Sequence, residues 1–380
     1  MDCDVDNNQD YYSELLHKII FKALKLNSSD IHIEPFENIL KIRMRIDGKL
    51  KEIYSYPKGV HIKLATFIKL NAGLDISEKR LPQDGRIDKK IKDTTLDLRL
   101  STIPTVHGEK IVIRILNRDK FIKDKSEIGF SDLAIKKIKN IVNNMSGMIL
   151  VTGPTGSGKT TTLYSILNDF KLMDKNIVTI EDPVEYKIEG INQTQVNTKI
   201  GFTFSRGLRS ILRQDPDIIM IGEIRDQETA KIAIRAASTG HLVISTMHTN
   251  NSIESINRLL DMGIPRYLIA STLTGIISQR LIRKVCKKCN SYRKSGCIDC
   301  NYTGYKGRIA IYEILEVNKI IKNAIINQEN IENIYDIAKL DNMITFEDSA
   351  SYLINENITN INEIISSKIM FDRGDVIESL

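Results

Sequence analysis

The stretch GPTGSGKTT decides the fold of this chain, and its residues are Gly153, Pro154, Thr155, Gly156, Ser157, Gly158, Lys159, Thr160 and Thr161. It has the Walker A spacing, in which glycines let backbone N–H groups fold around phosphate oxygens at the start of a helix. Apolar residues 148–152 before it indicate a buried strand, and apolar positions at helical spacing follow it up to Phe170. The order of strand, loop and helix predicts that Lys159 reaches the β- and γ-phosphates and that the Thr160 hydroxyl binds Mg²⁺.

Three further apolar runs follow this loop, at residues 177–180, 218–221 and 242–245. None of them alternates with polar residues, which is typical of parallel strands that are buried on both faces. Each runs into a polar residue at its carboxyl end, where ligands bind in open α/β sheets. The second domain is therefore predicted to be α/β, with a mostly parallel sheet wrapped by helices.

The first part of the chain has a different pattern. Residues 40–46 alternate between apolar and charged side chains and end at an Asp-Gly turn, and residues 96–100 and 110–116 indicate two more half-buried strands. We expect an α+β domain over residues 1–118, a linker over 119–127 and the second domain over 128–380, with a helical C-terminal region at 313–380.

Length, charge and hydropathy set broad limits. A chain of 380 residues has room for two cores. Its net charge of +6 is spread along the sequence and does not argue for nucleic acid. The N-terminus is acidic and polar, and no run of about 18 apolar residues occurs, so we expect a cytosolic protein without a signal peptide or membrane span.

Acidic residues and a histidine supply candidate chemistry after the later strands. In the segment DPDIIMIGE, a glycine replaces the usual Mg²⁺-binding aspartate and shifts the carboxylate to Glu223, which we expect to hold Mg²⁺ through water. Glu181 would then orient and deprotonate the attacking water, although swapped roles, or a capping role for Glu181, are alternatives. His248 should face the same cleft and contact the γ-phosphate, unless it is structural, whereas His241 lies at the far end of its strand.

Four of the five cysteines form two pairs with two residues between the partners: Cys286, Cys289, Cys297 and Cys300. Such pairs suit a closed tetrahedral Zn²⁺ site, and disulfides or an iron–sulfur cluster are the alternatives. We expect a zinc element over residues 283–312.

Several segments together resemble the family of type IV pilus assembly and type II secretion ATPases, within the secretion ATPase superfamily. They are GPTGSGKTTTLY, TIEDPVE, DPDIIMIGEIRD and STGHLVISTMHTN, with SDIHIEP, RMRIDGKL and LPQDGRI upstream. The resemblance implies a PAS-like domain, a RecA-like ATPase domain, and a ring of six copies with ATP and Mg²⁺ between subunits. It also implies that Arg99, Arg114, Arg209 and Arg213 approach the γ-phosphate or a subunit boundary, where a fixed planar charge suits phosphate; surface or ion-paired arginines are the alternative.

The tetracysteine element before TGYKGR resembles the assembly and secretion branch more than the retraction branch. The resemblance therefore implies a cytoplasmic motor that drives an inner-membrane platform protein of a pilus, a competence pseudopilus or a secretion system, and that reaches the membrane only through partners. The chain looks like a short form that lacks the family's first N-terminal domain. A RecA-like motor on nucleic acid and a nucleotide-binding scaffold without turnover are rival hypotheses. No cluster of basic and aromatic residues supports the first, and the intact Lys159, Thr160, Glu181 and Glu223 argue against the second.

Overall fold

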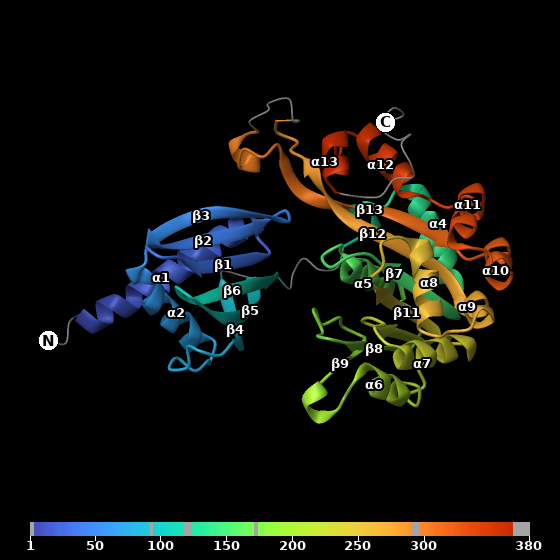
Figure 1. Ribbon diagram of the computed structural model, residues 1–380, viewed down its shortest axis with the longest axis horizontal. Helices are drawn as coiled ribbons and strands as arrows, with labels where there is room; N and C mark the ends of the chain where they lie inside the picture. Colours follow the sequence, from blue (N-terminus) through green and yellow to red (C-terminus); the bar gives the residue numbers. More distant parts are fainter. Residues whose placement is uncertain (1–3, 92–93, 118–122, 171–173, 290–295, 368–380) are drawn as a thin grey trace. The chain divides into compact units, whose positions relative to one another are not determined.

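The computed structural model describes residues 4–91, 94–117, 123–170, 174–289 and 296–367. The chain forms two compact units, Met1–Phe121 and Ile122–Leu380, which we call unit 1 and unit 2 (Figure 1). In these ranges, no helix is both long enough and apolar enough to cross a bilayer. The α/β class predicted from the sequence is confirmed.

Unit 1 is a six-stranded antiparallel sheet with strand order β3-β2-β1-β6-β5-β4. Its elements are α1 (Asp4–Lys25), β1 (Asp30–Pro35), β2 (Ile39–Ile46), β3 (Lys49–Pro57), α2 (Gly59–Asn71), β4 (Gln83–Ile91), β5 (Thr94–Thr105) and β6 (Gly108–Asn117). The alternating strands predicted at residues 40–46, 96–100 and 110–116 lie within β2, β5 and β6.

The period of two in these strands separates the faces of the sheet. Ile31 and Ile33 of β1 and Leu98 of β5 are buried in a core shared with Leu16 and Ile19 of α1. Charged residues at the intervening positions, such as Arg114 on β6, lie on the other face. One face of the sheet therefore packs against helices, as the alternation predicts.

A buried ion pair fixes α2 to this sheet. Lys69 of α2 is 1% exposed, and its Nζ donates to Glu109 Oε1 on β6 at 2.8 Å and to the Glu78 carbonyl at 2.6 Å. The Glu109 carbonyl in turn lies 2.8 Å from His61 Nε2. Both charges are thus compensated inside the unit, and removing one partner would leave the other buried alone.

We predict that Lys69→Met lowers the free energy of opening of unit 1 by about 3–5 kcal/mol, because the Glu109 carboxylate loses its cation. Hydrogen exchange of the β6 amides measures this energy within the full chain. Lys41→Met is the matched control, since its partner Glu52 is exposed and such pairs contribute about 0–1 kcal/mol. Equal effects of the two substitutions would contradict the prediction.

Unit 2 contains a seven-stranded sheet with order β13-β12-β7-β11-β10-β8-β9. All neighbouring strands are parallel except the antiparallel pair β12 and β13. Its strands are β7 (Gly147–Thr152), β8 (Ile177–Glu181), β9 (Asn192–Gln195), β10 (Ile218–Ile221), β11 (Leu242–Met247), β12 (Leu273–Val285) and β13 (Tyr305–Glu316). The predicted mostly parallel sheet is confirmed.

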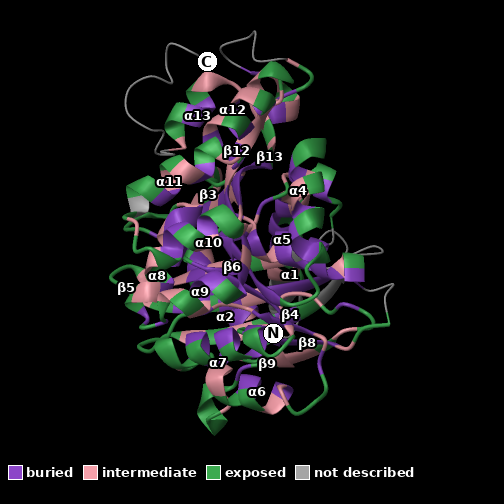
Figure 2. Cartoon of the chain, turned by 90° about the vertical axis from the view of Figure 1, so that its right-hand side faces the viewer, coloured by how far each residue is buried: buried purple, intermediate pink, exposed green. Residues whose placement is uncertain are grey.

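Helices cover both faces of this sheet. Its helices are α3 (Lys125–Ile128), α4 (Asp132–Asn143), α5 (Lys159–Phe170), α6 (Phe204–Ile211), α7 (Gln227–Ser238), α8 (Ser252–Asp261), α9 (Arg266–Thr272), α10 (Lys319–Ile326), α11 (Ile331–Leu340), α12 (Phe346–Asn355) and α13 (Ile361–Ser366). Successive residues of β7 enter different cores: Met148 packs with the α6–α11 side, and Ile149 packs with α4 and α5. The central strands are accordingly buried throughout (Figure 2).

β12 and β13 form a long hairpin, and α12 and α13 pack beside it (Figure 1). This hairpin corrects one prediction, since Glu313–Glu316 belong to β13 and are not helical. The reason is that the apolar run over residues 309–315 fits a buried strand as well as a helix. Helix α3 also begins at Lys125, within the predicted linker. Residues 119–122 of that linker, 290–295 of the cysteine element and 368–380 of the C-terminal region lie outside the described residues, as does residue 118 at the end of the predicted first domain.

Candidate nucleotide and metal sites

The predicted phosphate loop joins the end of β7 to the start of α5. Gly153 has φ +142°, and a Cβ there would lie 2.2 Å from the Gln279 carbonyl oxygen, so only glycine fits. Gly158, with φ +88°, also adopts a conformation that favours glycine. The glycines therefore allow both the turn and its close approach to β12.

Lys159, the first residue of α5, folds back over this loop. Its Nζ donates to the carbonyls of Gly153 at 2.8 Å and Pro154 at 3.0 Å, and the residue is 9% exposed. Burial lowers the Lys159 pKa to about 8, although attraction to Glu223 acts in the opposite direction. A phosphate group beside this ammonium would compensate a charge that the protein itself leaves poorly solvated.

Gln279 of β12 holds the loop from the other side. It is fully buried; its Nε2 donates to the Ser157 carbonyl at 2.8 Å, and its Oε1 accepts from Thr162 Oγ1 at 2.7 Å. One amide thus bridges the loop and the first turn of α5.

Two hydroxyls near the loop fit a bound ligand. Thr152 Oγ1 and Ser157 Oγ are buried and have no hydrogen-bond partner among the described residues. Buried polar groups are nearly always paired, so the two hydroxyls are matched to the acceptor oxygens that a nucleotide phosphate would bring. Thr160, predicted as a Mg²⁺ ligand, is the second residue of α5.

Glu223 follows β10 and meets the loop and β11. It forms an ion pair with Arg225, and its Oε2 lies 3.3 Å from His248 Nε2 after β11. The residue before Glu223 is Gly222. A Cβ at that position would lie 3.3 Å from the Glu181 Cα and from the Ile180 carbonyl oxygen, which is a tight contact. Glycine at this position thus lets β10 pack closely against the end of β8.

Glu181, at the end of β8, is 3% exposed and accepts hydrogen bonds on both oxygens. Tyr164 of α5 donates to Oε2 at 2.5 Å, while Thr179 Oγ1 and Gln193 Nε2 donate to Oε1 at 2.6 and 3.1 Å. Burial first, then the Glu181 charge, raise the pKa of Tyr164, which keeps its hydroxyl a proton donor.

The carboxyl edge of the parallel strands thus carries Lys159, Glu181, Glu223 and His248. His241 precedes β11 at the opposite edge, as expected, where its Nδ1 lies 3.0 Å from the Ala236 carbonyl oxygen.

The predicted arginines occupy two places. Arg209 of α6 pairs with Glu228 at 2.7 Å, and Arg213 Nη1 donates to the Arg209 carbonyl at 2.9 Å; both side chains are on the surface of unit 2.

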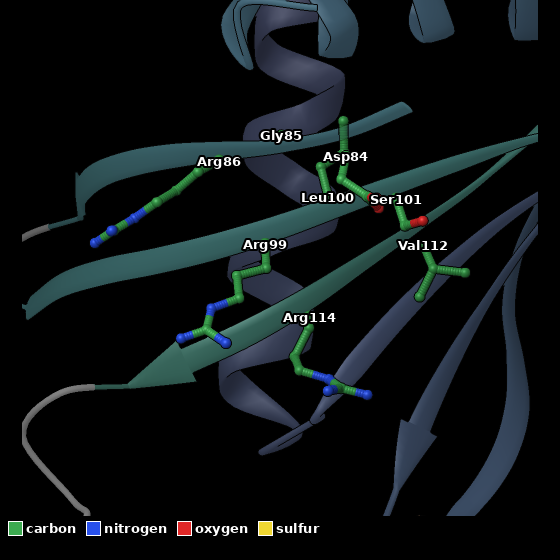
Figure 3. A pocket seen from close by; sticks show the side chains of 8 residues that line it. All are labelled: Asp84, Gly85, Arg86, Arg99, Leu100, Ser101, Val112 and Arg114. Atoms are coloured by element: carbon green, nitrogen blue, oxygen red, sulfur yellow. The ribbon is translucent and has the colours of Figure 1, made fainter. Parts of the chain in front are cut away.

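Arg99 and Arg114 are paired across β5 and β6 and line an open cavity of about 630 Å³ in unit 1 (Figure 3). Arg86, which the sequence analysis did not select, lies opposite Arg99 on β4 and also lines this cavity. Arg114 Nε donates to Asp30 Oδ1 at 3.2 Å.

The four cysteines converge in the loop between β12 and β13, and their sulfur atoms all lie within 4.8 Å of one another. The Sγ atoms of Cys286 and Cys297 are 3.8 Å apart, and those of Cys289 and Cys300 are 3.9 Å apart. A tetrahedral ZnS₄ site with Zn–S bonds of about 2.3 Å has sulfur atoms about 3.8 Å apart, whereas a disulfide requires about 2.05 Å. The separation therefore fits a metal centre, and none of these four cysteines forms a disulfide.

Neighbouring groups favour the thiolate form of Cys300. Burial opposes ionisation of Cys300, but backbone N–H groups of Cys297 and Gly304 donate to its Sγ, and the net effect lowers its pKa to about 6. Lys288 and Lys306, both bound to Asp299, add positive charge nearby. The thiolate is the form of a cysteine that binds Zn²⁺.

Comparison with known proteins gives one family. The model for type II/IV secretion system proteins matches residues 6–366. The chain belongs to this family. It is 44% identical over 380 residues to the type IV pilus assembly ATPase PilB of Thermus thermophilus, covering 94% of this chain and 43% of that protein. It is also 44% identical over 336 residues to the type II secretion system protein E of Dickeya dadantii, covering 83% of this chain and 68% of that protein.

Two solved structures have a similar fold. The pilus retraction motor PilT with bound ADP is 28% identical with a TM-score of 0.67, covering 96% of this chain and 98% of that one. The ATPase DotB of Legionella pneumophila, 22% identical with a TM-score of 0.74, covers 93% of this chain and 95% of that one, and shows likeness in fold.

Sequence reasoning missed residues that support the site, namely Tyr164, Gln193, Arg225 and Gln279. Gln279 stands with Ser278 and Arg280 between two pairs of apolar residues, at 276–277 and 281–282, so its polarity alone did not single it out. The others stand in ordinary contexts, and their roles depend on contacts between distant elements.

We predict that the affinity of this protein for Mg²⁺-ATP falls as pH rises above about 8, by up to about tenfold per pH unit. Lys159 loses its proton there in the free protein and must regain it to bind phosphate. Titration with a fluorescent ATP analogue from pH 7 to 10 measures this dependence. Lys159→Arg, which keeps its charge over this range, should show a flat profile, and an equal slope in both proteins would refute the prediction.

Proposed function

We propose that this chain is a Mg²⁺-dependent ATPase that works as a homohexamer and drives assembly of a type IV pilus, a pseudopilus or the fibre of a type II secretion system. In this proposal unit 1 is the PAS-like domain and unit 2 the RecA-like motor. The observation that carries it is the convergence of Lys159, Glu223 and His248 at one strand edge beside buried unpaired hydroxyls. The names of the pilus assembly and type II secretion relatives support the direction of work.

The two acids have different surroundings, which supports different roles. The Glu223 side chain is 12% exposed and electrostatically coupled to Lys159, so it is suited to hold Mg²⁺ through water. Glu181 lies behind it on the neighbouring strand and is suited to orient and deprotonate the attacking water. His248, bound to Glu223, would contact the γ-phosphate.

The ring supplies the remaining charges in this proposal. Arg99 and Arg114 of unit 1 and Arg209 and Arg213 of unit 2 would complete a site at a subunit boundary, where guanidinium groups neutralise charge on the transferred phosphoryl group. The motor would act at the cytoplasmic face of the inner membrane by pushing on a platform protein.

Glu223→Gln should lower the rate of phosphate release from ATP at least about 100-fold, because the amide holds Mg²⁺ and water less well. Lys175→Ala is the control, since Lys175 pairs with Asp217 at the opposite edge of the sheet and should leave the rate unchanged. Wild-type turnover by Glu223→Gln, with ring formation verified by light scattering, would exclude the proposed role.

Zinc at the four cysteines is the other part of this proposal. We predict about one bound Zn²⁺ per chain, lost in Cys289→Ser because three thiolates hold the ion far less tightly than four. Mass spectrometry of metal content measures the stoichiometry. Cys3→Ser, outside the cluster, should keep the metal, whereas an unchanged zinc content in Cys289→Ser would reject the assignment.

A further inference from the structure

The hydroxyl of Tyr164 has a fixed direction. Tyr164 is fully buried in α5, five residues after Lys159, and its oxygen accepts from the backbone N–H groups of Glu185 and Tyr186. Its single proton is therefore left for Glu181 Oε2, which it contacts at 2.5 Å. The hydroxyl links the helix of the phosphate loop, the end of β8 and the segment that follows β8.

The remaining acceptor site of Glu181 is on the same oxygen. A carboxylate has about four lone-pair sites, two on each oxygen. Thr179 and Gln193 both donate to Oε1, and Tyr164 donates to Oε2. The hydrogen bonds that the described residues make to Glu181 therefore leave one lone pair on Oε2, and the position of the Tyr164 hydroxyl decides where that lone pair points.

We propose that Tyr164 is a positioning residue that aims the open lone pair of Glu181 at the attacking water. The inference rests on the proposed role of Glu181 in hydrolysis. Because Tyr164 stands on the helix that begins at Lys159, it also keeps this acid in register with the phosphate loop. Its effect should appear in the chemical step and not in nucleotide binding, since the hydroxyl donates to Glu181, which is not part of the phosphate loop.

The test compares two tyrosines in the full chain. Tyr164→Phe removes the hydroxyl at Glu181, and Tyr312→Phe removes another nearly fully buried hydroxyl, which contacts Ser131 in the same core. We expect Tyr164→Phe to lower kcat about tenfold, while KM for ATP and the affinity for a fluorescent ATP analogue stay within about twofold. The acidic limb of its pH–rate profile should move to higher pH, because a carboxylate with fewer donors is protonated more readily. Tyr312→Phe should change neither kcat nor the limb, although both variants should lose thermal stability.

A third variant separates the direction of the open Glu181 lone pair from the number of hydrogen bonds that stabilise the charge of its carboxylate. Thr179→Val removes one donor from Oε1 and leaves Tyr164 and Oε2 in place. It should move the acidic limb as Tyr164→Phe does, with a smaller loss of kcat. A loss as large as that of Tyr164→Phe would overturn the aiming role, and so would kinetics of Tyr164→Phe that match those of Tyr312→Phe.

Glu181→Gln distinguishes a failure of this inference from a failure of the proposed function on which it rests. If Glu181→Gln abolishes turnover while Tyr164→Phe behaves like Tyr312→Phe, the proposed function stands and the role of Tyr164 is wrong. If Glu181→Gln keeps wild-type turnover, the role of Glu181 fails and the inference fails with it. If Tyr164→Phe does not fold, Thr179→Val still decides, because an unchanged acidic limb in that variant would contradict control of Glu181 by its donors.

Discussion

The buried amide of Gln279 is the interaction on which the nucleotide site depends. A phosphate loop has few side chains of its own to hold its shape, so its carbonyl groups need partners from the rest of the fold. Gln279 provides one through Ser157 and a second contact through Thr162. An unmade hydrogen bond at such a buried position costs about 1–3 kcal/mol, which is enough to favour one loop conformation strongly.

The positions of the other groups of the site can be traced from this contact along the sheet. The loop sets the start of α5, α5 places Tyr164, and Tyr164 contacts Glu181 on β8. Between β8 and β7 lie β10 and β11, which bring Glu223 and His248 to the same edge. The polar groups come from separate segments of sequence, and the parallel sheet brings them together because its strands end on one side.

The sequence predicted the helices and strands of this molecule better than the side-chain contacts between them. The apolar run at residues 148–152 and the alternation at residues 40–46 are each visible within a short stretch of sequence. The pattern of hydrophobic residues is therefore enough to locate these strands. β9 (Asn192–Gln195) escaped notice because it is a polar edge strand, yet it supplies Gln193 to Glu181. Tyr164 is similar: within α5 it resembles any core aromatic residue, and its function depends on a partner 17 residues away. The cysteine pairs were the opposite case, because a spacing of cysteines that is typical of metal ligands is visible in the sequence itself.

The hairpin of β12 and β13 has a mechanical consequence. Its strands are hydrogen-bonded along their length, and α13 braces the outer end, where Arg283 forms an ion pair with Glu363. Gln279 and Cys286 lie seven positions apart along a nearly continuous strand, about 23 Å at the usual rise per residue. Such an arm is stiff, so a movement of β12 beside the phosphate loop would also displace the cysteine end of the hairpin.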